Sequence, residues 1–172
     1  MSNNKNPQIK FAIQLLMSNQ GSTAQKICQE VLISDPFNAD AHDLLGVISS
    51  QKKNWDEALL FADKAISLNK ENGEFYNHRA IIYKNLKFFD ESISDYKMAA
   101  ILLPKSSEPL YNLAILLMET GDLNEALELN KKAARIDPDN IHITNNLGAI
   151  FQKLGLFEQA SLSYKKSLKI NT

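Results

Sequence analysis

The chain has 172 residues, of which 44% are hydrophobic and 23% charged, a balance typical of a folded protein rather than a disordered one. Its formal net charge is −1, whereas a nucleic-acid binder normally carries a basic surplus, so we expect no nucleic-acid partner. With 6 Gly, 5 Pro and 1 Cys, the composition excludes collagen-like sequence, an internal disulfide framework and a zinc site built from several cysteines. These counts favour a binding or scaffolding protein.

The sequence carries no signal for export or for membrane insertion. Residues 1–7 are polar and precede no apolar core of a signal peptide. Even the longest unbroken apolar runs, such as residues 98–103, are far shorter than the roughly 20 residues that a membrane-spanning helix needs. We therefore expect a cytoplasmic protein with a reduced Cys28 and no membrane insertion.

The sequence repeats itself with a period of about 34 residues. Five units fill nearly the whole chain, at 5–38, 39–72, 73–106, 107–140 and 141–172, and we interpret them as one domain. Four aligned series define the repeat: Ala24, Ala58, Ser92, Ala126, Ala160; Phe11, Leu45, Arg79, Leu113, Leu147; Ala12, Gly46, Ala80, Ala114, Gly148; and Pro36, Lys70, Pro104, Pro138, Thr172.

In chain order, the first unit shows the weakest pattern, and in the second unit Lys70 stands where three other units have proline. The fourth unit is the clearest. Its apolar residues follow helical spacing over 107–120 and again over 123–136, with a break at Gly121. Gly155 repeats that break in the fifth unit, and Pro138 ends the second helix. Each unit is therefore predicted to be two helices that bury their apolar faces only by stacking on neighbouring units.

At these positions the chain resembles the tetratricopeptide repeat family over essentially its whole length. The residues that carry the resemblance in the last two units are Leu110, Leu113, Ala114, Leu117, Ala126, Ala133, Pro138, Leu147, Gly148, Phe151, Ala160 and Tyr164. The resemblance implies an all-α, right-handed superhelical solenoid of helix–turn–helix repeats, with the first helix of each unit on the concave side. One departure concerns Asn130, which stands where Ala62, Tyr96 and Tyr164 favour an apolar residue.

Period and phase place one set of side chains on the concave side of the first helices. This predicted peptide-binding groove consists of Asp43, Leu44, Val47, Glu74, Asn77, His78, Ile81, Glu108, Tyr111, Asn112, Ile115, Asn145 and Asn146. The set mixes asparagine, aromatic and aliphatic side chains, whereas an ordinary solvated helix face is rich in Lys and Glu.

The asparagines of the groove have two interpretations. Asn112 and Asn146 lie one period apart, and asparagine both donates to and accepts from a peptide backbone. They resemble the asparagine ladder of O-linked N-acetylglucosamine transferase. The alternative is that they form structural hydrogen bonds between neighbouring hairpins.

Acidic residues also recur at one groove position, as Asp40, Glu74 and Glu108. They argue against the family's clamp for a terminal carboxylate, which needs positive charge here. An acidic mouth favours a basic or neutral extended partner. The alternative is that these acids only offset the dipole of each first helix.

The sequence supports no enzyme chemistry. The three histidines, His42, His78 and His142, are far apart, and Cys28 falls at a packing position. We therefore expect no catalytic residue, cofactor or metal.

The main functional hypothesis is a non-catalytic protein–protein interaction module that binds an extended peptide or a helix. Two alternatives stay open: the recognition region of a larger enzyme, such as an O-GlcNAc-transferase-like glycosyltransferase, and a self-assembling scaffold. Self-association is expected through the last helix, because no polar helix follows its apolar residues, Leu156, Ala160, Leu162, Tyr164, Leu168 and Ile170.

Overall fold

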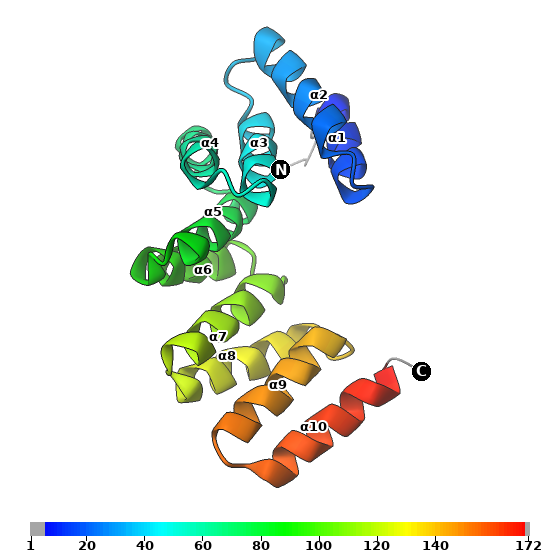
Figure 1. The fold of residues 1–172 in the computed structure, drawn as a ribbon, viewed down its shortest axis with the longest axis vertical. Coiled ribbons are helices and arrows are strands. Elements are labelled where there is room, and N and C mark those ends of the chain that lie inside the picture. Colours follow the sequence, from blue (N-terminus) through cyan, green and yellow to red (C-terminus); the bar gives the residue numbers. More distant parts are fainter. Residues whose placement is uncertain (1–5, 171–172) are drawn as a thin grey trace. The chain divides into compact units, whose positions relative to one another are not determined.

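A computed structural model describes residues 6–170, which form ten α-helices and no strand (Figure 1). The helices are α1 (Pro7–Met17), α2 (Gly21–Ser34), α3 (Ala39–Gln51), α4 (Trp55–Leu68), α5 (Gly73–Leu86), α6 (Phe89–Leu102), α7 (Glu108–Thr120), α8 (Leu123–Ile136), α9 (Ile141–Lys153) and α10 (Phe157–Ile170). The predicted all-α repeat architecture is confirmed. Residue 5 and residues 171–172, at the outer ends of the first and fifth predicted repeats, lie outside the described residues.

The chain divides into two compact units, residues 1–92 and residues 93–172, with the boundary inside α6. In the first unit, α1 packs on α2, α2 on α3, α3 on α4 and α4 on α5; α3 also contacts both α1 and α5. In the second unit, α7 packs on α8, α8 on α9, α9 on α10, and α7 also contacts α9. The first helices of consecutive repeats therefore lie against one another within each unit. The right-handed superhelical twist and the organisation of the five repeats as one domain stay predictions.

Polar side chains fix where the first helices begin. Asn38, Asn72 and Asn140 occupy one repeat position, and the side chain of each accepts a hydrogen bond from a backbone N–H of the first turn that follows. Asn140 accepts two, from His142 at 3.0 Å and Ile143 at 3.3 Å. These caps satisfy donors that have no partner inside the helix.

The turn between the two helices of each repeat contains one residue with positive φ. Gly121 and Gly155 fill this position in the last two repeats, with φ of 102° and 75°. Asn19, Lys53 and Lys87 fill it in the first three, with φ between 61° and 67°. Glycine adopts this left-handed conformation freely, whereas the lysines do so at a cost in backbone strain.

Small side chains and aliphatic residues form the core. In the first unit, one cluster joins the first three helices through Ile9, Ala12, Ala24, Cys28, Val31, Ala41, Leu44, Leu45 and Ile48. The first repeat is thus a packed hairpin although its sequence pattern is weak, and the expectation of a buried Cys28 is confirmed. Gly46 allows α3 to approach α4 closely, since a Cβ there would lie 3.2 Å from the carbonyl oxygen of Ala58.

Candidate functional site

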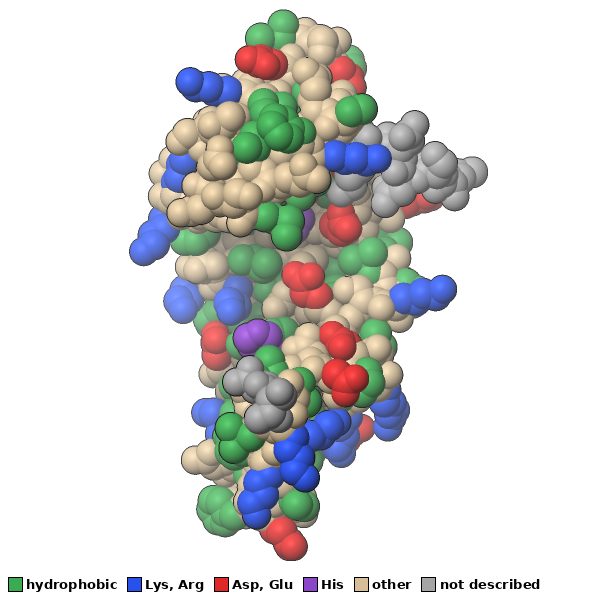
Figure 2. All heavy atoms as spheres, turned by 90° about the vertical axis from the view of Figure 1, so that its right-hand side faces the viewer, with side chains coloured by type: hydrophobic (Ala, Val, Ile, Leu, Met, Phe, Trp, Pro, Cys, Tyr) green, Lys and Arg blue, Asp and Glu red, His purple; other side chains and the backbone are tan. Residues whose placement is uncertain are grey.

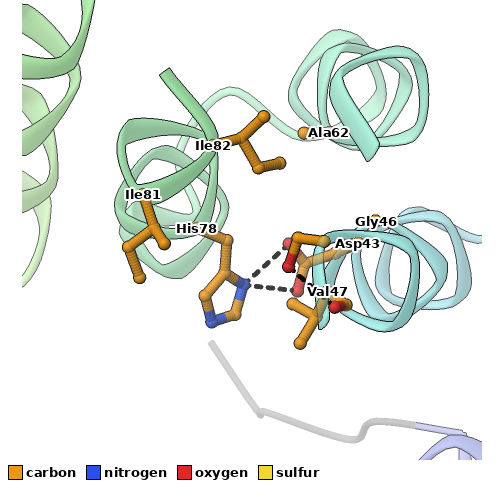
Figure 3. A pocket seen from close by; sticks show the side chains of 8 residues that line it. Asp43, Gly46, Val47, Ala62, His78, Ile81 and Ile82 are labelled. Atoms are coloured by element: carbon orange, nitrogen blue, oxygen red, sulfur yellow. Dashed lines mark hydrogen bonds and ion pairs between the residues drawn. The ribbon is translucent and has the colours of Figure 1, made fainter. Parts of the chain in front are cut away.

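A small hollow opens between α3 and α5 in the first unit (Figure 3). It has a volume of about 50 Å³. Its lining residues are Asp43, Gly46, Val47, Ser50, Ala62, His78, Ile81 and Ile82. Four predicted groove residues, two from each first helix, therefore line one cavity.

A hydrogen-bonded pair at this hollow links α3 to α5. The Nδ1–H of His78 donates to the carboxylate of Asp43, both of whose oxygens lie 2.9 Å away, as the dashed lines of Figure 3 show. Asp43 is buried and His78 half-buried. Ser50 also lines the hollow, but its hydroxyl donates to the carbonyl of Val47 at 2.8 Å rather than to the imidazole. These contacts fasten the second repeat to the third and do not form a nucleophile–base arrangement.

A second, more polar hollow of about 440 Å³ opens between α7 and α9 in the second unit. Its lining residues are Ser106, Ser107, Glu108, Tyr111, Asn112, Asp137, Asn140, His142 and Ile143. Three of these, Glu108, Tyr111 and Asn112, are predicted groove residues from α7. Burial raises the pKa of Tyr111 above its ordinary value of 10.0, so its hydroxyl stays protonated and able to donate at neutral pH.

The asparagines predicted for the groove have different environments. Asn112 is half-buried at the polar hollow, Asn145 is exposed, and Asn77 is buried. Asn146 is also buried, and its amide donates to the side-chain oxygen of Asn130 at 3.1 Å. For Asn146 the structural bond between hairpins is therefore observed.

The remaining predicted groove residues lie apart from the two hollows. Leu44 differs from the expectation because it packs into the hydrophobic core of the first unit. Glu74 is exposed on the first turn of α5, and Ile115 is half-buried on α7.

Several lining residues were missed by the sequence reasoning. Asp137 and Asn140 precede α9 and are absent from the predicted groove, although Asn140 repeats Asn38 and Asn72 at the same position. Gly46 and Ala62 are also absent from the predicted groove, and both line the hollow of the first unit.

The charge on the face shown in Figure 2 is mixed. Acidic and hydrophobic side chains are interspersed there, and Lys and Arg gather toward the end where α10 lies. Residues 6–170 contain no group of three or more His, Cys, Asp or Glu side chains able to hold a metal ion. No helix within that range is both long and apolar enough to cross a membrane.

Residues 105–172 match the family model described as Tetratricopeptide repeat. Among curated proteins, the small glutamine-rich tetratricopeptide repeat-containing protein 2 of Mycosarcoma maydis is 28% identical over 102 residues, which are 59% of this chain and 29% of that protein. The chain spans less than a third of the length of the curated relatives it matches.

Solved structures show the same fold. The PilF protein of Pseudomonas aeruginosa superposes with a TM-score of 0.87 at 20% identity, covering 94% of this chain and 74% of that chain. YrrB, described as a TPR protein with an unusual peptide-binding site, has a TM-score of 0.71 at 23% identity, covering 97% and 86%. The family match over residues 105–172, the relative named for its repeats and the shared fold agree, and together they support a tetratricopeptide repeat protein.

Proposed function

We propose that the chain binds an extended segment of a partner protein against the first helices of its repeats. One observation carries this proposal: in each unit, first helices of consecutive repeats share an open hollow lined by residues predicted for a peptide groove. Tetratricopeptide repeats are interaction modules, and YrrB, which shares the fold, is described by its peptide-binding site.

The chemistry of the α7–α9 hollow fits a peptide backbone. The Asn112 side chain contains amide N–H donors and a carbonyl acceptor, and the Tyr111 hydroxyl is a further donor at this hollow. An extended peptide exposes unpaired N–H and C=O groups that such side chains satisfy independently of the peptide's sequence. Glu108 and Asp137 line the same hollow, so a basic or neutral segment fits this surface better than an acidic one.

Selection of random peptides on the intact chain tests the proposal. Peptides displayed on phage are selected, synthesised and titrated by fluorescence anisotropy against the wild type and two single variants. Asn112→Ala removes a hydrogen-bonding side chain from the hollow, so we expect about 3- to 10-fold weaker binding. Asn146→Ala is the matched control, because the observed partner of its amide lies inside the protein. It should lower the melting temperature and leave the affinity of the folded chain unchanged.

Two results would contradict peptide binding at this face. One is that no peptide is enriched on the folded chain. The other is that the enriched peptides bind Asn112→Ala as tightly as the wild type, which would place their binding site elsewhere.

We also propose self-association through α10, because apolar side chains that are covered in inner repeats are exposed at this end. Leu168 is 68% exposed, whereas Ile66, at the same repeat position on α4, is 8% exposed because α5 follows it. Phe11 on α1 is likewise 54% exposed, against 3% for Leu45. A second copy that stacks its first repeat on α10 covers both ends.

Sedimentation velocity over a range of concentrations tests this self-association. The wild type should form larger species as its concentration rises, and Leu168→Glu should shift it to monomer. A wild type that stays monomeric at high concentration would refute the idea.

A further inference from the structure

In the first, second and fifth repeats, one position of the second helix packs beside the small residue of the first helix. We call it the facing position; it is occupied by Cys28, Ala62, Tyr96, Asn130 and Tyr164. In the fifth repeat the small residue is Gly148, and the ring of Tyr164 fills the space beside it. A Cβ added to Gly148 would lie only 2.5 Å from Cε1 of that ring. The large residue at the facing position thus compensates for the missing side chain on the first helix.

The second repeat lacks this compensation. Gly46 and Ala62 are both small, and both line the hollow between α3 and α5. The backbone of Gly46 already lies close to α4, since a Cβ there would be 3.4 Å from the backbone nitrogen of Ala62. The hollow therefore extends toward α5, whose Ile82 side chain points toward Ala62 in Figure 3.

The walls of this hollow select for an apolar occupant. Val47, Ile81 and Ile82 present aliphatic side chains, and Ala62 presents its methyl group. Asp43 is committed to its bond with His78, and its carboxylate opposes the entry of an acidic group. Water in such a hollow finds few partners, so its displacement by an apolar group favours binding.

The size of the hollow limits the occupant further. Its volume of about 50 Å³ is too small for an aromatic ring. An apolar cavity that holds benzene has a volume of about 150 Å³, so only a few carbon atoms fit in this hollow. We propose that this hollow is a specificity pocket that receives one branched aliphatic side chain, of the Val or Ile type, from the bound partner segment. The inference rests on the proposed peptide-binding function and adds the residue type that the partner must supply.

The test fills the pocket from inside the protein. Ala62→Val adds two carbon atoms at the base of the hollow, which matches its volume. Leu60→Val is the control, because it places the same residue on the same helix at a side chain that is 69% exposed. Peptides selected from the random library are titrated against both variants and the wild type. Each peptide is also made with its aliphatic residue replaced by Ala.

We expect Ala62→Val to weaken peptide binding about tenfold, since about two buried carbon groups are lost from the contact. Replacing the aliphatic residue of the peptide by Ala should weaken binding to the wild type by the same factor. The same peptide change should have almost no effect on binding to Ala62→Val, because the pocket is already filled. Leu60→Val should bind as the wild type does.

A second variant keeps the inference testable if Ala62→Val does not fold, which circular dichroism would show. Ile81→Ala widens the pocket, and the preferred peptide residue should shift toward Leu or Phe by about tenfold in relative affinity. Unchanged affinity of folded Ala62→Val, or an unchanged residue preference of Ile81→Ala, overturns the pocket. If peptides depend on Asn112 but not on Ala62, the pocket falls and the proposed function stands. If no peptide binds, both fall.

Discussion

The buried pair Asn130–Asn146 is predicted to stabilise the second unit by joining α8 to α9. The side chain of Asn130 is fully buried, and its amide donates to the backbone carbonyl of Ile143 at 2.8 Å. Its carbonyl oxygen accepts the amide of Asn146 at 3.1 Å. Asn130 therefore both donates to and accepts from α9, without contact with water.

The size of the effect follows from these bonds. Asn130→Ala removes two hydrogen bonds worth about 0.5–1.5 kcal/mol each. It also removes the observed acceptor of the buried Asn146 amide. We expect a loss of about 2–3 kcal/mol of unfolding free energy. At about 2–4 °C per kcal/mol for a chain of this size, the melting temperature should fall by about 4–12 °C. Asn146→Ala removes only the shared bond and should cost about 1–2 kcal/mol.

Urea unfolding followed by far-UV circular dichroism measures these losses in a double-mutant cycle. Because both single variants lose the same bond, the double variant should be little less stable than Asn130→Ala alone, with a coupling of about 1 kcal/mol. Asn145→Ala is the control, since this neighbouring asparagine is exposed and should change stability by less than about 0.5 kcal/mol. Strictly additive losses, or an Asn130→Ala variant as stable as the wild type, would refute the reasoning.

Three further predictions concern single positions. Gly148→Ala should cost about 1–3 kcal/mol, because the new Cβ meets the ring of Tyr164; Tyr164→Ala should relieve most of that loss in a urea-unfolding cycle. Lys53→Gly should raise the unfolding free energy by about 0.5–1 kcal/mol in urea, because it relieves a φ of 62° in the α3–α4 turn. Burial raises the pKa of the Cys28 thiol from 9.0 to about 11, so a thiol reagent at about pH 8 should label the folded chain far more slowly than the unfolded chain. Between pH 9 and about 11 the thiol ionises in the unfolded chain but stays protonated in the folded chain, so the unfolding free energy should fall as the pH rises through this range, and Cys28→Ala should remove that fall.

The architecture could be predicted from the sequence because repetition strengthens a weak signal. A single amphipathic stretch is ambiguous, but the same helical spacing, turn and small residues recur through the chain. Even the first repeat, whose pattern is weakest, packs as predicted because Ala12 and Cys28 keep the small side chains that the hairpin needs. The turn between the two helices of a repeat could be predicted only where its positive-φ residue is glycine, because lysine, as at Lys53 and Lys87, does not indicate a positive φ.

The candidate site could be predicted only in part, because helical phase gives a direction and not the depth of burial. Phase placed Leu44 on the concave side, yet the neighbouring α1–α2 hairpin covers it. In the sequence, Asn130 departs from a position that is otherwise mostly apolar. Its hydrogen bonds to Ile143 and Asn146 on α9 explain why asparagine stands there. The hollow between α3 and α5 depends on two small residues on different helices and on Ile82 beyond them. No single segment of sequence contains that combination.

Substitution of Ala62 distinguishes two interpretations of the hollow between α3 and α5, a specificity pocket and a packing defect, because they predict different consequences of filling the hollow. In the free protein, we expect the two carbon atoms added by Ala62→Val to pack against Ile82, which lies in the same cluster as Ala62, and burying them contributes about 1.5 kcal/mol. The β-branched residue loses about 0.5 kcal/mol of helix propensity, so the net gain in unfolding free energy is about 1 kcal/mol. A packing defect would gain this stability with no loss of binding, whereas a specificity pocket gains stability and loses about tenfold in peptide affinity. Thermal melting and anisotropy on the same preparation give both values. A stability that falls instead would mean that the space beside Ala62 cannot accept a side chain, and the proposed occupant would then have no room.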